Sequence, residues 1–390
     1  MVSKALRGMP EIQETMLHTG QHYDLQMSQV FFAELDIPAP AYDLGIGSGT
    51  HGRQTGRMLE EIEKVLLAEK PDWVLVYGDT NSTLAGALAA AKLNIPVAHV
   101  EAGLRSFNRR MPEEVNRVLT DHVSTLLFAP TALAMANLAR EGIDHDGTLL
   151  VGDVMYDAAL YYGSLASRQS TVLEQLNIRP KEYVLATIHR AENTDSDARL
   201  QTILTGLSKI ALDIPVVFPL HPRTRSAMLV AVGAATNGIR FVEPVSYLDM
   251  AMLEKNSRVI ITDSGGIQKE AFFFSVPCIT VRDETEWNEL VEMGWNRLAP
   301  PTNPANLATA FKLALAQTPR STHNPYGDGH SAERIVNHLL DWGRKPIPSS
   351  RVVLKPAVSS VHVNLTACGD RETVATFDFT NSRLSTGKTT

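Results

Sequence analysis

The segment Val74-Leu75-Val76-Tyr77-Gly78-Asp79-Thr80 decides the fold class. It is an apolar, largely β-branched run that ends in a glycine and two polar residues. The Ala- and Leu-rich stretch Ser82–Lys92 follows and is typical of a helix, and Pro96–Val100 predicts the next strand. A strand, a helix and a second strand in this order indicate a parallel sheet with a crossover helix.

The same alternation continues along most of the chain. Further strands are expected at Leu126–Ala129, Leu149–Val151, Tyr183–Ile188, Pro215–Pro219, Arg240–Val242, Val259–Thr262 and Cys278–Val281. We therefore predict an α/β protein with two doubly wound, Rossmann-like domains, at residues 1–165 and 166–330. The stretch Tyr161–Ser170 is expected to connect them.

The two ends of the sequence depart from this pattern. The first residues are polar and helix-like, and the first expected strand is Thr15–His18, so the first domain is expected to lack its opening strand. Apolar residues lie on one face of Ser331–Gly343, which predicts a final amphipathic helix within residues 331–345. Residues 346–390 include 13 Ser or Thr among 45 residues. We expect this tail to be disordered or weakly β.

Composition limits the classes of function. The chain carries 36 Lys and Arg against 43 Asp and Glu, so 36 − 43 = −7, which predicts no general affinity for nucleic acid or an anionic membrane. No segment is apolar enough for a transmembrane span, and the start lacks the core of a signal peptide. Cys278 and Cys368 are too few for a disulfide framework, and the histidines lack metal-ligand spacing. A soluble protein of a reducing compartment is expected.

Polar residues follow five expected strands, at the ends where open α/β sheets bind ligands. They are Asp79, Thr80, His99, Glu101, Arg105, His189, Arg190, Glu192, His221, Arg223 and Asp263 to Gly266. Their distribution over both domains predicts an interdomain cleft. No Gly-x-Gly-x-x-Gly follows a strand and the sequence has no P-loop, which argues against nicotinamide and P-loop nucleotide sites.

One motif, Thr262-Asp263-Ser264-Gly265-Gly266-Ile267-Gln268-Lys269-Glu270, follows a strand and opens a helix. Small residues let backbone amides approach a phosphate, and the helix dipole favours the anion. An ordinary strand–turn–helix junction with Ser264 as the cap explains the pattern equally well. Glu270 fits either a contact to a ribose hydroxyl or a surface acid near the helix start.

Three carboxylates are candidates for proton transfer. Glu101 ends an apolar strand, where a carboxylate is costly unless it is functional, paired with Arg105 or capping a helix. Asp79 also fits a helix cap, and Glu113 taken alone is typical of a plain helix start. Together with His189, these carboxylates in one cleft would separate one another's pKa values, which suits proton abstraction and donation.

Seven motifs occur in one order and carry a resemblance to a known family. They are Thr19-Gly20-Gln21-His22, Gly78-Asp79-Thr80, His99-Val100-Glu101-Ala102-Gly103-Leu104-Arg105, Pro112-Glu113-Glu114-Val115-Asn116-Arg117, Thr187-Ile188-His189-Arg190, Asp263-Ser264-Gly265-Gly266-Ile267-Gln268 and Gly327-Asp328-Gly329. Over residues 11–343 the chain closely resembles the bacterial non-hydrolysing UDP-N-acetylglucosamine 2-epimerases.

The resemblance implies a glycosyltransferase-B-like fold, with a last helix that crosses back to the first domain. It implies an isomerase that interconverts UDP-GlcNAc and UDP-ManNAc without a redox cofactor or a metal. In the family, C2 loses its proton while UDP leaves C1, and UDP adds again to the 2-acetamidoglucal after C2 is reprotonated on the opposite face. A cytoplasmic homodimer that serves cell-envelope polysaccharide synthesis is also implied.

The resemblance carries over to individual residues. Asp79, Glu101 and Glu113 correspond to the acid and base carboxylates, and His189 to a group that stabilises the departing diphosphate. The implied UDP contacts are Ser264, Gly265 and Gly266 for the diphosphate, Glu270 for the ribose, and Tyr247 and Met250 nearby. Gln21, His22, Arg57, Arg190 and His221 match the positions where the family binds a second, activating UDP-GlcNAc.

The sequence also departs from the family. The family's first strand and its Gly-Thr-Arg-Pro loop have no counterpart after Met1, Met250 stands where many members have Phe, and Trp287 replaces a common Arg. The alternatives are an epimerase of a modified UDP-sugar such as a 2,3-diacetamido uronic acid, a UDP-sugar glycosyltransferase, and an inactive truncated member. Three carboxylates argue against a glycosyltransferase, because transfer to an acceptor needs fewer acids.

Overall fold

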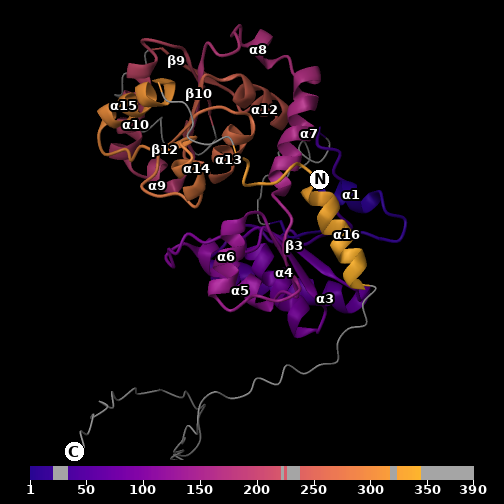
Figure 1. Ribbon diagram of the computed structural model, residues 1–390. Helices are drawn as coiled ribbons and strands as arrows, with labels where there is room; N and C mark the ends of the chain where they lie inside the picture. The colour runs from indigo at the N-terminus through magenta and orange to yellow at the C-terminus, as the bar shows by residue number, and fades with distance from the viewer. Residues whose placement is uncertain (21–33, 221–223, 226–237, 317–322, 344–390) are drawn as a thin grey trace, which may run out of the picture. The chain divides into compact units, whose positions relative to one another are not determined.

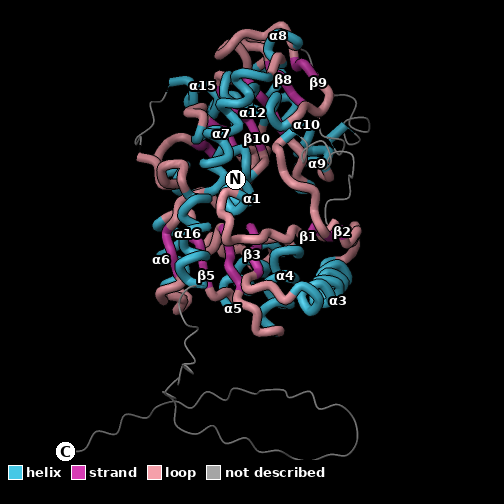
Figure 2. The backbone as a smooth tube through the Cα atoms, turned by 90° about the vertical axis from the view of Figure 1, so that its right-hand side faces the viewer, coloured by secondary structure: helices cyan, strands magenta, loops and turns pink. Residues whose placement is uncertain are grey.

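The computed structural model describes residues 1–20, 34–220, 224–225, 238–316 and 323–343. These residues belong to one compact unit, Met1–Lys345. Gln21, His22, His221 and the expected tail at 346–390 lie outside the described residues. Two separate parallel sheets with helices between their strands confirm the predicted α/β class (Figures 1 and 2).

The first sheet has four parallel strands in the order β3-β4-β5-β6. They are β3 (Val74–Tyr77), β4 (Val97–Val100), β5 (Leu126–Ala129) and β6 (Thr148–Leu150). Four helices follow or precede these strands, α3 (His51–Glu69), α4 (Asn81–Lys92), α5 (Pro112–Val123) and α6 (Ala132–Arg140). Helices α3 and α4 pack side by side (Figure 2).

A second, small parallel sheet pairs β1 (Leu17–His18) with β2 (Tyr42–Asp43). The helix α1 (Val2–Arg7) precedes it, so the helix-like start and a first strand near Thr15–His18 agree with expectation. Thr19 Oγ1 lies 2.7 Å from Ser82 Oγ and joins the end of β1 to α4. The pair β1-β2 is not hydrogen-bonded to β3 in the part of the chain that the structure describes.

The second sheet is parallel and has six strands in the order β12-β11-β10-β7-β8-β9. They are β7 (Val184–Thr187), β8 (Val216–Pro219), β9 (Ile239–Val242), β10 (Val259–Thr262), β11 (Cys278–Thr280) and β12 (Asn296–Leu298). The accompanying helices are α8 (Val172–Gln175), α9 (Ala191–Thr194), α10 (Asp197–Ile210), α12 (Tyr247–Asn256), α13 (Gly265–Phe273), α14 (Asn288–Glu292) and α15 (Pro304–Ala316).

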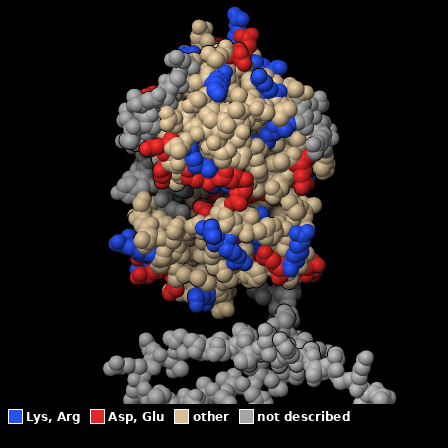
Figure 3. Space-filling model, turned by 90° about the vertical axis from the view of Figure 1, so that its left-hand side faces the viewer, with Lys and Arg blue, Asp and Glu red and all other residues tan. Residues whose placement is uncertain are grey.

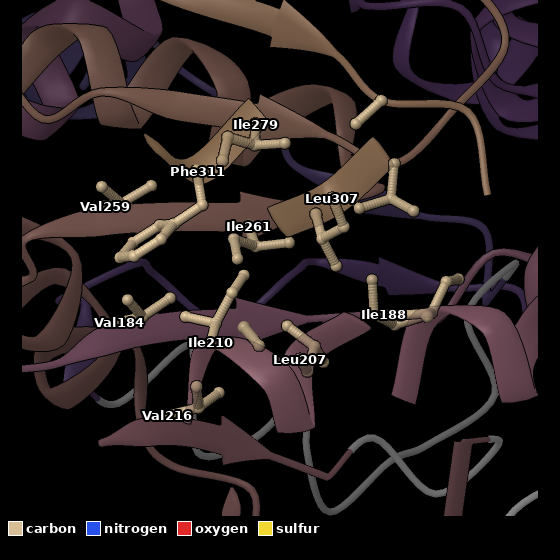
Figure 4. Packing of buried hydrophobic residues seen from close by; sticks show 14 of the residues in the cluster. Val184, Ile188, Leu207, Ile210, Val216, Val259, Ile261, Ile279, Leu307 and Phe311 are labelled. Atoms are coloured by element: carbon tan, nitrogen blue, oxygen red, sulfur yellow. The ribbon is translucent and has the colours of Figure 1, made fainter. Parts of the chain in front are cut away.

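Both faces of this sheet are buried, as a parallel sheet requires. Side chains alternate along a strand, so Val184 and Ala186 face one layer while Leu185 faces the other. Val184 packs with Ile261, Ile210 and Phe311 in the larger cluster (Figure 4). Burial of a whole side chain of this size contributes about 1.5–3 kcal/mol.

Two helices join the two sheets in the chain. Residues Tyr161–Ser170, expected to connect the domains, lie in the second half of α7 (Val154–Gln169) and at its C-cap. The last described helix, α16 (Ser331–Gly343), packs Ile335 and Val336 against Phe128 of the first sheet and lies beside α1 (Figure 1). The chain therefore returns to the first sheet after completing the second. None of the described helices is long and apolar enough to span a membrane.

Candidate active site

Glu101 sits at the carboxyl end of β4. Its φ is +77°, a left-handed value that residues other than glycine rarely adopt, and its N–H donates to the Phe128 carbonyl oxygen at 3.1 Å. Uncommon backbone of this kind gathers at functional sites. The Glu101 carboxylate accepts a hydrogen bond from Lys269 Nζ at 3.0 Å. A β-carbon on Gly78 would lie 3.5 Å from Glu101 Oε2, so Glu101 also faces the loop that carries Asp79.

Arg105, the partner predicted for Glu101, is paired with other carboxylates. Arg105 Nη1 pairs with Asp121 at 2.8 Å and Arg105 Nη2 with Glu141 at 2.7 Å. The alternative of a Glu101–Arg105 salt bridge is therefore wrong. The sequence did not reveal the true partners of Arg105 because they are distant along the chain. Asp121 on α5 and Glu141 after α6 come close to Arg105 only in the folded domain.

His99 fixes the loop beside Glu101. It is buried, with Nδ1 2.6 Å from Asp121 Oδ1 and Nε2 2.8 Å from the Gly78 carbonyl oxygen. Both neighbours are acceptors, so both ring nitrogens donate and the imidazole is protonated. Burial alone would lower the pKa of His99, but the hydrogen bond and charge of Asp121 outweigh it and raise this pKa. The protonated ring thereby anchors the turn that precedes Asp79.

Asp79 is paired rather than capping a helix. The Thr80 side chain caps α4 by accepting from the Thr83 amide, so the helix-cap alternative for Asp79 is wrong. The Asp79 carboxylate forms an ion pair with Arg117 of α5. The backbone carbonyl oxygen of Asp79 accepts a hydrogen bond from Asn116 Nδ2 at 2.9 Å. Glu113 lies exposed in the first turn of the same helix. Asp79 and the start of α5 are thus neighbours, joined through Arg117.

His189 is oriented by a buried carboxylate. Asp263 is fully buried and accepts from the amides of His189 and Arg190 at 3.0–3.1 Å and from Asn193 Nδ2 at 3.0 Å. Its Oδ1 lies 3.4 Å from His189 Nδ1. The His189 side chain keeps 40% of its surface exposed. Asp263 therefore holds the loop after β7 while the imidazole faces outward.

The motif after β10 forms the start of α13. Ser264 is the N-cap residue, as the strand–turn–helix alternative predicted, but its side chain makes no capping hydrogen bond. The Gly265 carbonyl oxygen accepts from Trp287 Nε1 at 2.9 Å, and a β-carbon at Gly265 would lie 2.4 Å from Glu286 Oε1. A larger residue at position 265 would therefore displace the Glu286 carboxylate. The backbone amides of the loop, at a nine-residue helix, are suited to an anion.

Glu270 faces inward from the same helix. Its Oε1 accepts from the Tyr247 hydroxyl at 3.2 Å, and burial raises the pKa of Glu270 although this hydrogen bond opposes the rise. Glu270 is thus half-buried and hydrogen-bonded rather than a fully solvated surface acid. Met250, on α12 with Tyr247, packs against the cluster that contains Leu253 and Ile260.

Residues 4–340 match the family model described as UDP-N-acetylglucosamine 2-epimerase. The chain belongs to this family. The predicted family and its glycosyltransferase-B-like α/β fold class are therefore confirmed.

Several relatives of this 2-epimerase family member cover most of its length. The UDP-N-acetylglucosamine 2-epimerase of Methanocaldococcus jannaschii is 50% identical over 84% of this chain and 91% of the relative. The UDP-2,3-diacetamido-2,3-dideoxy-D-glucuronate 2-epimerase of Pseudomonas aeruginosa is 49% identical over 87% of this chain and 94% of the relative.

Solved structures agree. A crystal structure of the M. jannaschii enzyme in complex with UDP-GlcNAc and UDP has a TM-score of 0.80 and 49% identity, over 87% of this chain and 95% of that one. The Neisseria meningitidis UDP-GlcNAc 2-epimerase bound to UDP-GlcNAc has a TM-score of 0.77 and 30% identity, over the same shares of the two chains.

Only part of the expected activator site of this family member falls within the described residues. Arg190 Nη2 lies 4.0 Å from Glu286 Oε1, and Arg57 is exposed on α3. Gln21, His22 and His221 lie outside the described residues, so the activator site stays a prediction.

The face of this family member drawn in Figure 3 gives an anionic ligand little general attraction. Figure 3 shows Asp and Glu side chains gathered across the middle of one face. An exposed hydrogen bond of 2.8 Å joins Asn108, after β4, to Glu284, after β11. Diphosphate binding would therefore depend on backbone amides and on individual cations. No cluster of three or more His, Cys, Asp or Glu in the described part of the chain is arranged to hold a metal ion.

Sequence reasoning assigned no role to two buried residues of this site, Asp263 and Lys269. Both lie inside the quoted motif after β10. Asp263 accepts hydrogen bonds from backbone amides of the loop after β7, and Lys269 contacts Glu101 after β4 and Asp153 at the start of α7. A charged residue in a segment predicted to pack against a sheet was the available signal.

Proposed function

We propose that this protein is a UDP-N-acetylglucosamine 2-epimerase, an isomerase that interconverts UDP-GlcNAc and UDP-ManNAc. One observation carries the proposal. Glu101, at the end of a first-sheet strand, contacts Lys269 on the helix whose N-terminus is Ser264-Gly265-Gly266. A carboxylate suited to proton transfer and a helix start suited to a diphosphate are thereby joined in one site.

The reaction requires proton transfer and departure of UDP to be coupled. A carboxylate takes the C2 proton, the C2–H electron pair forms the C1=C2 bond of 2-acetamidoglucal, and the C1–O bond breaks with its electron pair on UDP. UDP then adds to C1 after a second acid delivers a proton to the opposite face of C2. Asp79, Glu101 and Glu113 are the proposed proton carriers, since a base and an acid must flank the sugar.

The leaving diphosphate needs positive charge and donors. We assign His189 to this role, because Asp263 orients its loop while the ring is still accessible. The amides of Ser264, Gly265 and Gly266 would donate to the phosphate oxygens at the positive end of α13. Such donors, fixed before reaction, stabilise charge as it develops.

The nucleoside would occupy the neighbouring surface of α12 and α13. Glu270 would accept from the ribose hydroxyls, with Tyr247 holding the carboxylate in place. Met250 would lie near the uracil, where its thioether can adapt to a flat ring.

Exchange of the C2 proton with solvent tests the proposal. In D2O with UDP-GlcNAc, we expect deuterium at C2 and formation of UDP-ManNAc, followed by proton NMR. A folded sample, checked by circular dichroism, that binds UDP but incorporates no deuterium would reject the epimerase function. UDP release only after an acceptor sugar is added would instead support a glycosyltransferase.

A second candidate substrate is UDP-2,3-diacetamido-2,3-dideoxy-D-glucuronate, named for the P. aeruginosa relative. The same C2 chemistry serves both sugars, so the carboxylates do not discriminate between them. Parallel measurement of kcat/KM for the two UDP-sugars decides, and a ratio above about one hundred would identify the physiological class.

We further propose a cytoplasmic homodimer, activated by a second UDP-GlcNAc, that supplies cell-envelope polysaccharide synthesis. The family resemblance supports these proposals, with Arg57 and Arg190 as described residues of the activator site. Light scattering on the purified protein tests the dimer. Activation predicts that reverse epimerisation of UDP-ManNAc accelerates when UDP-GlcNAc is added, and that Arg190→Ala abolishes the acceleration.

A further inference from the structure

Lys269 is buried to a degree that lysine reaches only when it is paired. Its Nζ lies 2.7 Å from Asp153 Oδ2 and 3.0 Å from Glu101 Oε1. The same nitrogen lies 4.2 Å from the centroid of the Trp287 ring, which adds a cation–π contact. Lys269 is thus fixed by three partners.

The three charged residues of this cluster lie in three different parts of the fold. Lys269 lies on α13 of the second sheet, Glu101 follows β4 of the first sheet, and Asp153 is the N-cap residue of α7. Asp153 Oδ1 accepts from the Met155 amide at 2.8 Å, so Asp153 is itself immobilised by the helix start. Lys269 therefore ties Glu101 to rigid parts of both sheets.

The charges around Glu101 do not balance. Burial raises the pKa of the Glu101 carboxyl, the charge of Lys269 lowers it, and the charges of Asp153 and Asp79 raise it again, so that it stays above its ordinary value. Two further groups interact electrostatically with Glu101, the protonated His99 of the preceding strand and the Tyr326 hydroxyl. Lys269 is the cation that contacts Glu101 directly.

We infer that Lys269 is a positioning residue that holds the Glu101 carboxylate in place and ionised, ready to accept the C2 proton. The inference rests on the proposed epimerase function. It also explains why Lys269 has two carboxylate partners. When Glu101 takes up a proton its attraction for Lys269 falls, and Asp153 then keeps the ammonium group in position for the return of the proton.

Three substitutions separate charge from structure. Lys269→Met keeps most of the length and removes the charge, Lys269→Arg keeps the charge, and Asp153→Asn keeps an oxygen for capping α7 while removing one negative charge. Lys312→Met, at an exposed position of α15, is the matched control. For each we would measure kcat and KM from pH 5 to 9 by deuterium incorporation, together with UDP affinity by calorimetry.

Opposite shifts are expected. Removal of the Lys269 charge raises the pKa of Glu101. The acidic limb of the pH–kcat profile, where kcat declines because Glu101 becomes protonated, therefore shifts to higher pH by about 1–3 units. Below the new limb, kcat falls about tenfold for each pH unit, while KM and UDP affinity change less than about threefold. Asp153→Asn moves the limb down, because it removes a negative neighbour. Lys269→Arg and Lys312→Met retain the wild-type limb.

The outcomes distinguish the positioning role of Lys269 from the proposed epimerase function. If wild-type protein shows no exchange, the proposed function fails. If wild-type protein exchanges but Lys269→Met and Asp153→Asn leave the limb unmoved, the inference is overturned and Lys269 is only a structural bridge. If Lys269→Met does not fold, Asp153→Asn alone decides through the direction of its shift.

Discussion

Two buried charge clusters differ in how completely their charges are balanced. The first, His99, Asp121, Arg105 and Glu141, combines two cations with two carboxylates within the first sheet and its helices. The second, Lys269, Glu101 and Asp153, combines one cation with two carboxylates and spans both sheets. Buried ions are stable when paired, so the balanced cluster is suited to structure. The unbalanced cluster leaves a carboxylate able to exchange a proton.

The two clusters meet at Gly78-Asp79. His99 of the balanced cluster holds the Gly78 carbonyl oxygen, while Glu101 of the unbalanced cluster faces the same loop. A rigid cluster thus supports a reactive one. Reactive carboxylates commonly depend on such supporting contacts, because a displacement of about 1 Å can cost a hundredfold in rate.

The largest expected effect is on activity at Glu101. Glu101→Gln keeps the size and a hydrogen-bond acceptor for Lys269 but cannot take up a proton. We expect deuterium exchange at C2 to fall about 10²–10⁴-fold, the usual contribution of general base catalysis, with UDP affinity unchanged. NMR exchange rates and calorimetry measure these quantities. If Glu101→Gln retained more than a tenth of the wild-type exchange rate, Glu101 would not be the residue that transfers the proton.

Substitution in the balanced cluster should reduce the stability of the fold, whereas substitution of Glu101 reduces activity. Asp121→Ala leaves His99 and Arg105 buried without their shared partner, so we expect a loss of about 3–5 kcal/mol in the free energy of unfolding. Urea denaturation measures it. Leu119→Ala on the exposed side of α5 is the control and should change stability by less than about 1 kcal/mol. A loss below that value for Asp121→Ala would show that the cluster is not a structural support.

The sequence predicts those features of this molecule that depend on a local pattern of residues. The strand Val184–Thr187 lies within the predicted Tyr183–Ile188, because this segment is a short and almost wholly apolar run. The three-residue strand Asn296–Leu298 was not predicted, because it carries polar residues and is too short for a period. The motif around Ser264 was found, but the role of Lys269 was not. Its partners lie 168 and 116 residues away, and no local signal encodes such pairings.

Stability against pH should change in the same direction for both clusters but over different ranges, above about 4.5 for Glu101 and above about 6.5 for His99. The folded-state pKa of His99 is raised, so its stabilisation is complete below about 6.5 and is lost as pH rises through the raised value. The deficit of His99→Gln relative to wild type should therefore shrink as pH rises. The pKa of Glu101 is also raised, but here folding favours the neutral acid. Ionised Glu101 thus costs stability, and Glu101→Gln should gain on wild type as pH rises.

Urea unfolding of wild type and the two variants at pH 5, 6, 7 and 8 measures both slopes. Differences between proteins are used because all other titrating groups cancel between them. Parallel curves for Glu101→Gln and wild type would mean that Lys269 fully compensates the Glu101 charge. The contrast between balanced and unbalanced clusters would then be lost.

The smallest effect is expected at Glu270, a carboxylate whose direct partner is the neutral Tyr247 hydroxyl. Tyr247→Phe removes one hydrogen bond, worth about 0.5–1.5 kcal/mol, so UDP should bind about 2- to 12-fold more weakly with little change in kcat. Calorimetric titration with UDP measures the change. Tyr42→Phe is the matched control, because Tyr42 also donates to a glutamate, Glu69, but at the exposed end of α3. Equal UDP affinity for both variants would place the ribose elsewhere. A weaker affinity for Tyr247→Phe alone would show that a carboxylate held by a neutral donor serves binding, while the one held by a cation serves proton transfer.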